Sequence, residues 1–500
     1  MPESKSRRAA QADMTADVVI IGGGSAGLSA ALTAAQGGAS VVVLEKTDRV
    51  GGAGNYAEGV FGVETEMQRA RWMNVTREQV FLDEMNDTRW ESNVALVRRF
   101  QGQSAATIDW LIAQGVAFDG PTKNDWTNAP TWHVITGHGK AMIKTLHAKL
   151  ADYPGVRLLL ETAAKDLIVT DGRVAGVHAQ AASGETFAVT ARGGVIVSTG
   201  GFANSPAMLE KYANLTGAVQ LADIGRTGDG INMAHGAGAQ FDIMSPVMMQ
   251  PTLDIHDHKM GEDELLLSMI GLEPRNVWVD KSGERFTNEV IAFDFPFAAN
   301  ALRRVKFAWS IFDETLRHRY MTKGIDVGLG VIIPPMTVVT RFDALWDAAI
   351  TAGTTAVVKA ASVVELARKT GLPHAVLQET LARYNSSAAV NLDEAFGKDR
   401  RWLQKMSMDG PFYALRITYA IVTTLGGIKV DDHLHALDAN DRPIQGLYLT
   451  GNDAGGLVAA DTYTITAAPG TSFGFAVGSG RMAAQDILAG LKAGASAVAA

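Results

Sequence analysis

The sequence predicts an α/β fold in which a doubly wound parallel sheet carries an inserted α+β domain. Residues 17–21 (DVVII) form a continuous apolar run, which is typical of a strand buried on both faces of a parallel sheet. A glycine-rich turn, an alanine-rich segment over 28–36 and a second apolar run over 40–44 complete one strand–helix–strand unit. The same glycine-rich style returns after Gly426, whereas residues 251–423 mix helices and loops.

The length of the chain supports two domains, because 500 residues exceed what one hydrophobic core usually supports. We expect a discontinuous first domain, residues 15–250 and 424–495, and an inserted domain, residues 251–423. Residues 1–14 are expected to form a flexible leader.

The remaining elements follow from hydrophobic periodicity. Residues 77–114 and 139–150 are expected to be helical. Short apolar runs separated by turn residues predict a small antiparallel layer with strands at 156–160, 167–169, 174–178 and 187–190. An apolar strand over 195–198 leads into a Gly-Gly pair, and a last helix is expected from Gly470 to about residue 488.

Composition excludes several classes of function. The net charge of −8 argues against nucleic acid as a partner, because phosphate binding requires a basic face. The chain contains no cysteine, which excludes disulfides, thiolate catalysis and cysteine-bound iron–sulfur clusters. Any redox group must therefore be organic.

Two segments near the start resemble targeting or membrane segments but lack their physical requirements. Arg7 and Arg8 resemble a twin-arginine signal, but residues 9–17 contain two acids and no apolar core. Residues 18–44 are apolar, but six glycines divide them into strand, turn, helix and strand, which lipid would not tolerate. We therefore expect a cytoplasmic protein without stable membrane insertion.

The glycines Gly22, Gly24 and Gly27 stand between the first strand and the first helix in the pattern GxGxxG. In this Rossmann-type pattern the first glycine permits a tight turn, the second lets the backbone approach a pyrophosphate, and the third lets helix and strand pack closely. Glu45 ends the second strand, where its carboxylate can accept hydrogen bonds from a ribose diol. The unit therefore predicts a dinucleotide site.

A second glycine cluster, residues 51–54 (GGAG), lets the chain pass closely along a cofactor, as a flavin requires and NAD does not. The order of segments resembles the fumarate reductase and succinate dehydrogenase flavoprotein superfamily, which includes the 3-ketosteroid dehydrogenases. The resemblance covers roughly 17–488 and rests on residues 22–45, 51–52, 199–202 (TGGF), 227–230 (TGDG), 283–289 (GERFTNE), 425–427 (LGG), 443–448 (PIQGLY), 451–452 (GN) and 469–474 (PGTSFG).

The resemblance implies an FAD domain built from both ends of the chain and an insertion that caps the flavin. It implies non-covalent FAD, because no histidine lies near residues 51–62 to carry a covalent link. The start of the last helix would stabilise negative charge at the flavin C2 carbonyl. The implied cofactor-binding residues are Gly22, Gly24, Ser25, Ala26, Gly27, Glu45, Lys46, Gly51, Gly52, Gly200, Asp229, Gly451, Asn452, Gly470, Ser472 and Phe473.

The sequence departs from the fumarate reductases where they bind a dicarboxylate. Gln250 stands where they have a histidine before Pro-Thr, Phe293 where they have an arginine, and Thr423 where they have a histidine. The neutral run 467–470 (AAPG) replaces their C-terminal arginine. Carboxylates are usually bound by cationic side chains, so a neutral or mostly apolar substrate is expected.

The pair Pro469-Gly470 resembles the ketosteroid enzymes, in which a glycine N–H helps to polarise a substrate carbonyl. The proton-handling residue stays open among Tyr463, Tyr419, His133 and Asp294, since phenol, imidazole and carboxyl groups can all act as acid or base. We expect His256 and His258 to lie in a solvated loop rather than to bind metal.

These observations predict an FAD-dependent oxidoreductase that transfers hydride between flavin N5 and a carbon β to a carbonyl. The reaction would be desaturation of a ketone-like small molecule or reduction of an activated double bond, with an unidentified electron donor or acceptor. The alternatives are an oxygen-using oxidase or amine-type dehydrogenase, and a flavin-binding protein that has lost catalysis.

Overall fold

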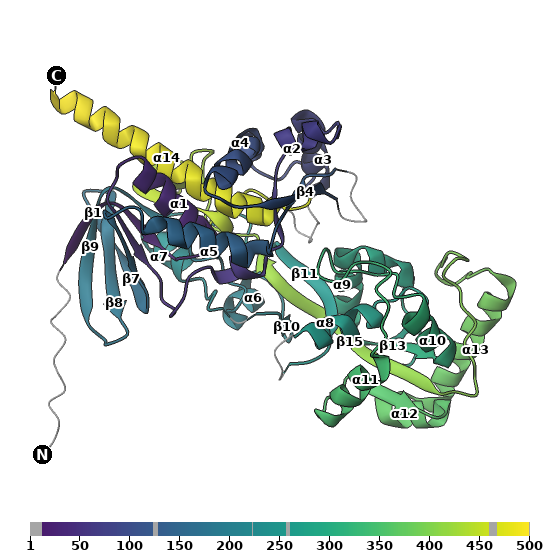
Figure 1. Ribbon diagram of the computed structural model, residues 1–500. Coiled ribbons are helices and arrows are strands. Elements are labelled where there is room, and N and C mark those ends of the chain that lie inside the picture. Colours follow the sequence, from purple (N-terminus) through teal and green to yellow (C-terminus); the bar gives the residue numbers. More distant parts are fainter. Residues whose placement is uncertain (1–12, 124–128, 223, 257–260, 460–467, 500) are drawn as a thin grey trace, which may run out of the picture. The chain divides into compact units, whose positions relative to one another are not determined.

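The computed structural model describes residues 13–123, 129–222, 224–256, 261–459 and 468–499. These residues form two compact units (Figure 1). The first unit is drawn from Met1–Asn214, Asp223–Val247 and Thr423–Ala500, and the second from Leu215–Ala222 and Met248–Val422.

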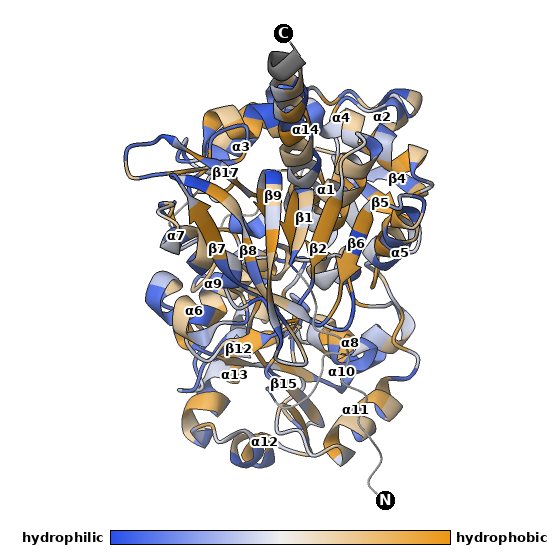
Figure 2. Cartoon of the chain, turned by 90° about the vertical axis from the view of Figure 1, so that its left-hand side faces the viewer, coloured by the Kyte–Doolittle hydropathy of each residue, from blue (hydrophilic) through white to orange (hydrophobic). Residues whose placement is uncertain are grey.

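The first unit is built around an eight-stranded sheet with the order β16-β17-β9-β1-β2-β6 and a side branch in which β7 pairs with β8 and β8 with β9. The pairs β17–β9, β9–β1, β1–β2 and β2–β6 are parallel, as the apolar runs predict. Figure 2 shows hydrophobic residues along the central strands. The strands are β1 (Met14–Ile21), β2 (Val41–Leu44), β6 (Val156–Leu159), β7 (Thr162–Thr170), β8 (Arg173–Ala181), β9 (Thr186–Val197), β16 (His435–Leu437) and β17 (Pro443–Leu449).

Strand β9 joins two runs that the sequence presents as separate strands. Its first half pairs with β8 in the antiparallel layer, and its second half pairs with β1 and β17 in the parallel sheet. Gly193 and Gly194 lie where these halves meet, and a Cβ on Gly193 would stand only 2.9 Å from the carbonyl oxygen of Asp17. The glycines therefore let one strand pass closely along β1 between the two layers.

Helices of the first unit cover this sheet. Helix α14 packs so closely on α1 that a Cβ on Gly480 would stand 2.1 Å from the carbonyl oxygen of Ala26. The helices are α1 (Ser25–Gln36), α2 (Glu66–Ala70), α3 (Arg77–Asp87), α4 (Val94–Ala113), α5 (His138–Leu150), α6 (Pro206–Ala213), α7 (Asp229–Gly236) and α14 (Thr471–Ala499), with 3₁₀ turns η1 (Gly52–Tyr56) and η3 (Gly451–Asp453).

The expectation of one helix over residues 77–114 is wrong, because α3 ends at Asp87 and α4 begins at Val94. Arg89 and Trp90 adopt positive φ angles of 53° and 63°, which a helix cannot accommodate. The side chain of Asn93 then caps α4 by accepting a hydrogen bond from the backbone N–H of Leu96 at 3.1 Å.

A three-stranded antiparallel sheet, β3-β5-β4, also belongs to the first unit. It consists of β3 (Gly59–Phe61), β4 (Phe118–Thr122) and β5 (Trp132–Ile135). The backbone N–H of Phe61 donates to the carbonyl of Gly470 at 3.0 Å, so this small sheet lies against the start of α14.

The second unit has a mixed sheet with the order β10-β15-β13-β12, in which β11 and β14 also pair with β15. Its strands are β10 (Val219–Gln220), β11 (Val247–Leu253), β12 (Val277–Val279), β13 (Ala308–Asp313), β14 (Val357–Ala360) and β15 (Phe412–Thr424). Its helices are α8 (Glu262–Gly271), η2 (Glu289–Phe293), α9 (Phe295–Val305), α10 (Glu314–Thr322), α11 (Phe342–Thr351), α12 (Val363–Thr370) and α13 (His374–Val390).

The GERFTNE motif, residues 283–289, contributes buried ion pairs to this second unit. Arg285 donates to both Glu289 and Asp393, at 2.8 and 3.0 Å, and Lys398 lies 3.2 Å from Glu289. All four groups are buried, so the motif forms a closed network of paired charges in the core of the unit.

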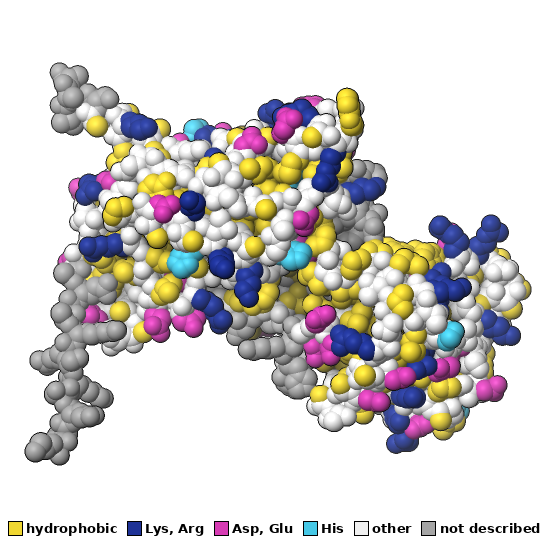
Figure 3. Space-filling model, in the orientation of Figure 1, with side chains coloured by type: hydrophobic (Ala, Val, Ile, Leu, Met, Phe, Trp, Pro, Cys, Tyr) yellow, Lys and Arg dark blue, Asp and Glu magenta, His cyan; other side chains and the backbone are white. Residues whose placement is uncertain are grey.

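On the face drawn in Figure 3, acidic and basic side chains are interspersed rather than gathered by sign. None of the described helices is both long and apolar enough to cross a membrane.

Candidate cofactor site and active site

The GxGxxG turn forms the junction between β1 and α1, as the sequence predicts. Gly22 has a φ of +103°, and a Cβ there would stand 2.4 Å from the carbonyl oxygen of Ser198. A Cβ on Gly27 would stand 1.9 Å from the carbonyl oxygen of Gly22, so only glycine lets the helix approach the turn. Gly24 precedes α1 without a side-chain cap, and a Cβ there would meet no heavy atom within 4 Å.

Glu45 reaches back from the end of β2 to this turn. Its Oε2 accepts a hydrogen bond from the backbone N–H of Gly23 at 2.8 Å. Its Oε1 accepts from both the backbone N–H and the hydroxyl of Thr47, each at 2.8 Å. The carboxylate is therefore fixed beside the glycine turn, and its oxygens keep capacity for further donors such as ribose hydroxyls.

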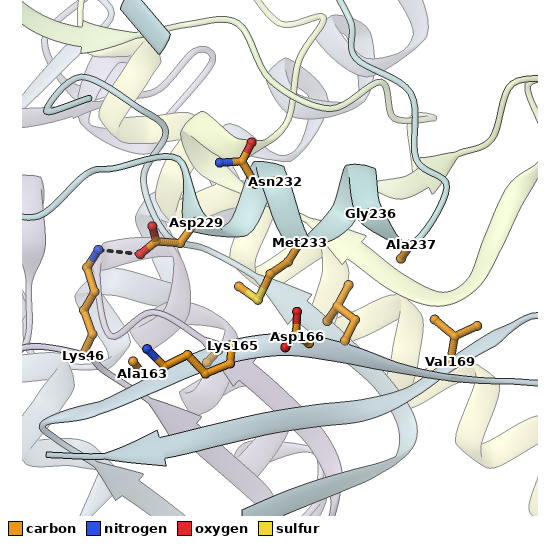
Figure 4. A pocket seen from close by; sticks show the side chains of 12 residues that line it. Lys46, Ala163, Lys165, Asp166, Val169, Asp229, Asn232, Met233, Gly236 and Ala237 are labelled. Carbon is orange, nitrogen blue, oxygen red and sulfur yellow. Dashed lines mark hydrogen bonds and ion pairs between the residues drawn. The ribbon is translucent and has the colours of Figure 1, made fainter. Parts of the chain in front are cut away.

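A pocket of about 580 Å³ is lined by Lys46, the residue after Glu45 (Figure 4). Lys46 and Asp229 form a salt bridge of 2.6 Å at its rim, and Thr227 donates to Asp229 at 2.8 Å. The backbone N–H of Thr162 donates to the carbonyl of Glu45 at 2.8 Å, which brings the start of β7 to the same place. The other walls come from β7 and α7: Ala163, Ala164, Lys165, Asp166, Leu167, Val169, Asn232, Met233, Gly236 and Ala237.

The second glycine cluster lies directly beside the first. The backbone N–H of Gly51 donates to the carbonyl of Gly23 at 2.9 Å, and Gly51 and Gly52 have φ angles of +110° and +48°. A Cβ on Gly54 would stand 3.2 Å from the Cβ of Ser25 and 3.3 Å from the ring of Phe473. Both glycine clusters and the first turn of α14 therefore meet in one place.

Asp453 organises a third segment of the site, and the sequence analysis did not identify it. Its carboxylate accepts hydrogen bonds from the backbone N–H groups of Thr199, Gly200 and Gly201 and from the hydroxyl of Thr199. Burial raises the pKa of this carboxyl, and the four hydrogen bonds oppose that rise. The available signal was an acid directly after the Gly-Asn pair at the end of an apolar strand.

The other predicted residues of this segment lie close to Asp453. Gly200 and Gly201 have φ angles of +87° and +81°, a turn that the carboxylate of Asp453 holds in place. The backbone N–H of Gly451 donates to the hydroxyl of Ser479 on α14 at 2.9 Å. The side-chain amide of Asn452 donates to the hydroxyl of Thr423 at 2.5 Å.

Gly470 begins α14 in a left-handed conformation with a φ of +87°. Its carbonyl accepts from Phe61, and the carbonyl of Pro469 accepts from the hydroxyl of Thr131 at 3.0 Å. Within the described part of the chain, the N–H of Gly470 has no hydrogen-bond acceptor. Ser472 and Phe473 follow in the first turn of the helix and are half-buried.

The candidates for the proton-handling residue fall in different places. Tyr463 lies outside the described residues. Tyr419, on β15 of the second unit, is buried and donates its hydroxyl proton to the carbonyl of Thr216 at 3.2 Å. Burial raises the pKa of this phenol.

His133 is buried between two hydrogen bonds. Its Nδ1 lies 3.0 Å from the carbonyl of Thr131 and therefore carries the proton, and its Nε2 lies 2.8 Å from the hydroxyl of Thr65 and accepts from it. Burial lowers the pKa of the imidazole to about 4, so the ring is neutral at neutral pH.

The remaining candidates lie in the second unit. Asp294 caps α9 by accepting from the N–H of Phe297 at 3.1 Å, and Phe293 packs against Trp402 with ring centroids 5.1 Å apart. His256 lies 2.8 Å from Asp254, and His258 lies outside the described residues. The described residues contain no cluster of three side chains that could hold a metal ion.

The residues of the first unit fit FAD. Gly24 leaves open space above the start of α1, where a pyrophosphate would meet backbone N–H groups and the positive end of the helix dipole. Glu45 and the pocket beside it suit a ribose and its base. The N–H of Gly470 at the start of α14 suits the other end of the cofactor or its substrate.

We expect the purified protein to be yellow and to release intact FAD when it is denatured by acid or heat. Replacing Glu45 with alanine should weaken FAD retention, because the variant loses the carboxylate that fixes Gly23 and that would accept hydrogen bonds from the ribose. Glu45→Gln keeps one oxygen acceptor and should retain more FAD than Glu45→Ala. Colour that stays with the precipitated chain would contradict non-covalent binding.

Comparison with known proteins identifies this arrangement. The family model described as an FAD binding domain matches residues 17–461. The vinyl phenol reductase of Lactiplantibacillus plantarum is 34% identical, over 93% of this chain and 94% of that protein. The 3-oxosteroid 1-dehydrogenase of Mycolicibacterium smegmatis is 32% identical, over 71% of this chain and 63% of that protein.

Among solved structures, the open conformation of a flavocytochrome c3 fumarate reductase aligns with a TM-score of 0.75 and 26% identity. The alignment covers 95% of this chain and 78% of the other. This confirms the predicted doubly wound α/β fold and the resemblance to fumarate reductases and ketosteroid dehydrogenases. The chain belongs to the FAD-binding-domain family and is an FAD-dependent oxidoreductase.

Proposed function

We propose that this enzyme reduces an activated carbon–carbon double bond in a neutral, mostly apolar small molecule. The observation that carries the proposal is the similarity to a vinyl phenol reductase over more than nine-tenths of both chains. The missing cationic groups at Gln250, Phe293 and Thr423 support it, because they leave no clamp for a dicarboxylate at those positions. When bound and reduced by an electron donor, the flavin would supply the hydride for such a reduction.

Gly470 is the residue of the first unit best suited to polarise the substrate. A backbone N–H aimed at a carbonyl oxygen conjugated with the double bond would stabilise the negative charge that develops there, and losing one such donor typically costs 100-fold or more in turnover. Any other residue at position 470 would distort the backbone, because φ is +87° and a Cβ would stand 2.7 Å from the nitrogen of Phe61. The role of this N–H is therefore tested by changing the oxygen of the substrate rather than residue 470.

The experiment for the proposed function is steady-state turnover with a chemically reduced electron donor. The panel contains 4-vinylphenol, an enone, an alkene without oxygen, and fumarate. Reduction of the first two at enzymatic rates would support the proposal. A holoenzyme that reduces none of these compounds would contradict the proposal. The remaining alternatives would then be an oxidase and a protein without catalysis, and formation of peroxide in air would distinguish the first from the second.

Fumarate and succinate are expected to be neither substrates nor tight ligands. The side chains at Gln250, Phe293, Thr423 and the 467–470 run cannot form the two cationic clamps that a dicarboxylate requires. Fumarate turnover of roughly 1 s⁻¹ or more would show that other residues form the clamp.

For the proton, we propose Tyr463. The other candidates are engaged: Tyr419 donates to Thr216, and His133 is a neutral ring with both nitrogens bonded. Asp294 caps α9. Tyr463→Phe should slow turnover about 100-fold, whereas Tyr419→Phe should change it little. If Tyr463→Phe stays active while Tyr419→Phe or His133→Ala loses most of its turnover, the proton-transfer role belongs to the residue whose substitution removes activity. Full activity in all three variants would indicate that water supplies the proton.

A second candidate function is α,β-desaturation of a ketone. The similarity to a 3-oxosteroid 1-dehydrogenase and the Pro469-Gly470 pair favour it. Oxidation of a saturated ketone with an artificial electron acceptor, at a rate above that of alkene reduction, would select it. The physiological electron partner and the location in the cytoplasm stay predictions, and cell fractionation tests the second of them.

A further inference from the structure

Trp132 and His133 are neighbours on β5 and point to opposite faces of the small antiparallel sheet, as adjacent strand residues do. His133 is buried against Thr65 on one face. Trp132 pairs with Phe61 of β3 and with Thr122 of β4, and its side chain is half-buried. Phe61 on the same face is buried, so solvent reaches this face of the sheet at Trp132 itself.

The indole of Trp132 lies against two glycines at the start of α14 and β3. Its Cδ1 is 3.0 Å from the place where a Cβ on Gly470 would stand. Its Nε1 is 2.9 Å from the place where a Cβ on Gly59 would stand. The N–H edge of the indole therefore lies between these two glycines, beside the backbone that presents the N–H of Gly470.

Neither of these two N–H groups has an acceptor among the residues that the structure describes. Two other indoles of the same unit do have one: Trp110 donates to Gln36 at 2.9 Å, and Trp90 donates to Asn86 at 3.2 Å. A bound ligand that carries an oxygen acceptor could therefore receive a hydrogen bond from either of these N–H groups.

We propose that Trp132 is a specificity-determining residue of the active site. Its indole N–H donates to an oxygen of the substrate, next to the N–H of Gly470. This selects alkenes conjugated to a phenol or carbonyl oxygen over hydrocarbon alkenes of the same shape. The proposal rests on the proposed function, because it takes the space beside Gly470 as the substrate site.

The test is equilibrium binding to the oxidised holoenzyme, followed by the change in flavin absorbance. The probes are 4-ethylphenol and ethylbenzene, which differ only in the hydroxyl group. Wild type should bind 4-ethylphenol more tightly, and Trp132→Phe, which removes the N–H and keeps an aromatic ring, should reduce that preference about tenfold. Trp110→Phe is the matched control, because it removes an indole N–H from the same unit, and it should keep the preference.

Turnover measurements test the role of Trp132 separately from the proposed function. In Trp132→Phe, kcat/KM for 4-vinylphenol should fall at least tenfold, while FAD content and melting temperature stay near those of wild type. If Trp132→Phe does not fold, Trp132→His, which keeps a ring N–H, and Trp132→Leu, which has none, replace it. The histidine variant should then retain the preference that the leucine variant loses.

An unchanged preference in Trp132→Phe, in an enzyme that still reduces vinyl phenols, would overturn the role of Trp132 and leave the function intact. A wild-type enzyme that reduces no alkene but binds 4-ethylphenol through Trp132 would overturn the function and leave the binding role intact.

Discussion

Replacing Gly24 with alanine is expected to lower the affinity for FAD roughly a thousandfold without weakening the apoprotein. The φ of −74° at Gly24 suits alanine, and the new Cβ would meet no protein atom within 4 Å. The methyl group would instead occupy the space in which we expect a pyrophosphate to meet the start of α1. Losing two charge-assisted hydrogen bonds accounts for an effect of this size. Titration of the apoprotein with FAD measures the affinity, and thermal unfolding of the apoprotein provides the comparison.

Gly27→Ala is the matched control for this prediction. Its Cβ would stand 1.9 Å from the carbonyl oxygen of Gly22, so the substitution forces α1 away from β1. We expect this variant to unfold at a lower temperature even without FAD. A Gly24→Ala protein that binds FAD as wild type does would show that the cofactor does not use the open space at Gly24.

The second prediction concerns a buried carboxyl group away from the glycine turns. Glu84 on α3 is 1% exposed, and neither of its oxygens has a donor among the described residues. Burial, with a smaller contribution from Asp87, raises its pKa from 4.5 to about 8. The folded protein therefore holds this proton to higher pH than the unfolded chain does.

Stability should accordingly fall as the pH rises from about 4.5 through about 8. The loss attributable to Glu84 is up to roughly 4–5 kcal/mol, and Glu84→Gln should abolish that part of the decline. Melting temperatures at pH 5 and pH 8.5 measure it: the variant should match wild type at pH 5 and exceed it at pH 8.5. Glu78→Gln, at the exposed start of the same helix, is the control and should not reproduce this gain.

If the melting temperatures of wild type and Glu84→Gln fall equally between pH 5 and pH 8.5, ionisation of Glu84 does not destabilise the folded protein. Glu273 in the second unit also has a pKa raised to about 8 by burial. It is present in both proteins, so it does not enter the comparison.

The sequence by itself determined the features that depend on neighbouring residues. The GxGxxG turn, the two strands around it and Glu45 lie within about thirty residues, and their roles follow from conformational freedom and strand ends. The sequence also carried the family resemblance, and with it FAD and the α/β fold. It could not divide residues 77–114 correctly, because the positive φ angles at Arg89 and Trp90 leave no composition signal.

Only the tertiary structure decided which distant segments meet. Asp453 bonds to Thr199, Gly200 and Gly201, about 250 residues earlier. Its place after the Gly-Asn pair marks an acid at a strand end, but it does not show which distant N–H groups this acid binds. Trp132 reaches Gly470 in the same way, through the register of the small sheet and the hydrogen bond from Phe61 to Gly470. Local sequence sets which backbone conformations are allowed, whereas the packing of remote strands decides which polar groups remain available for a ligand.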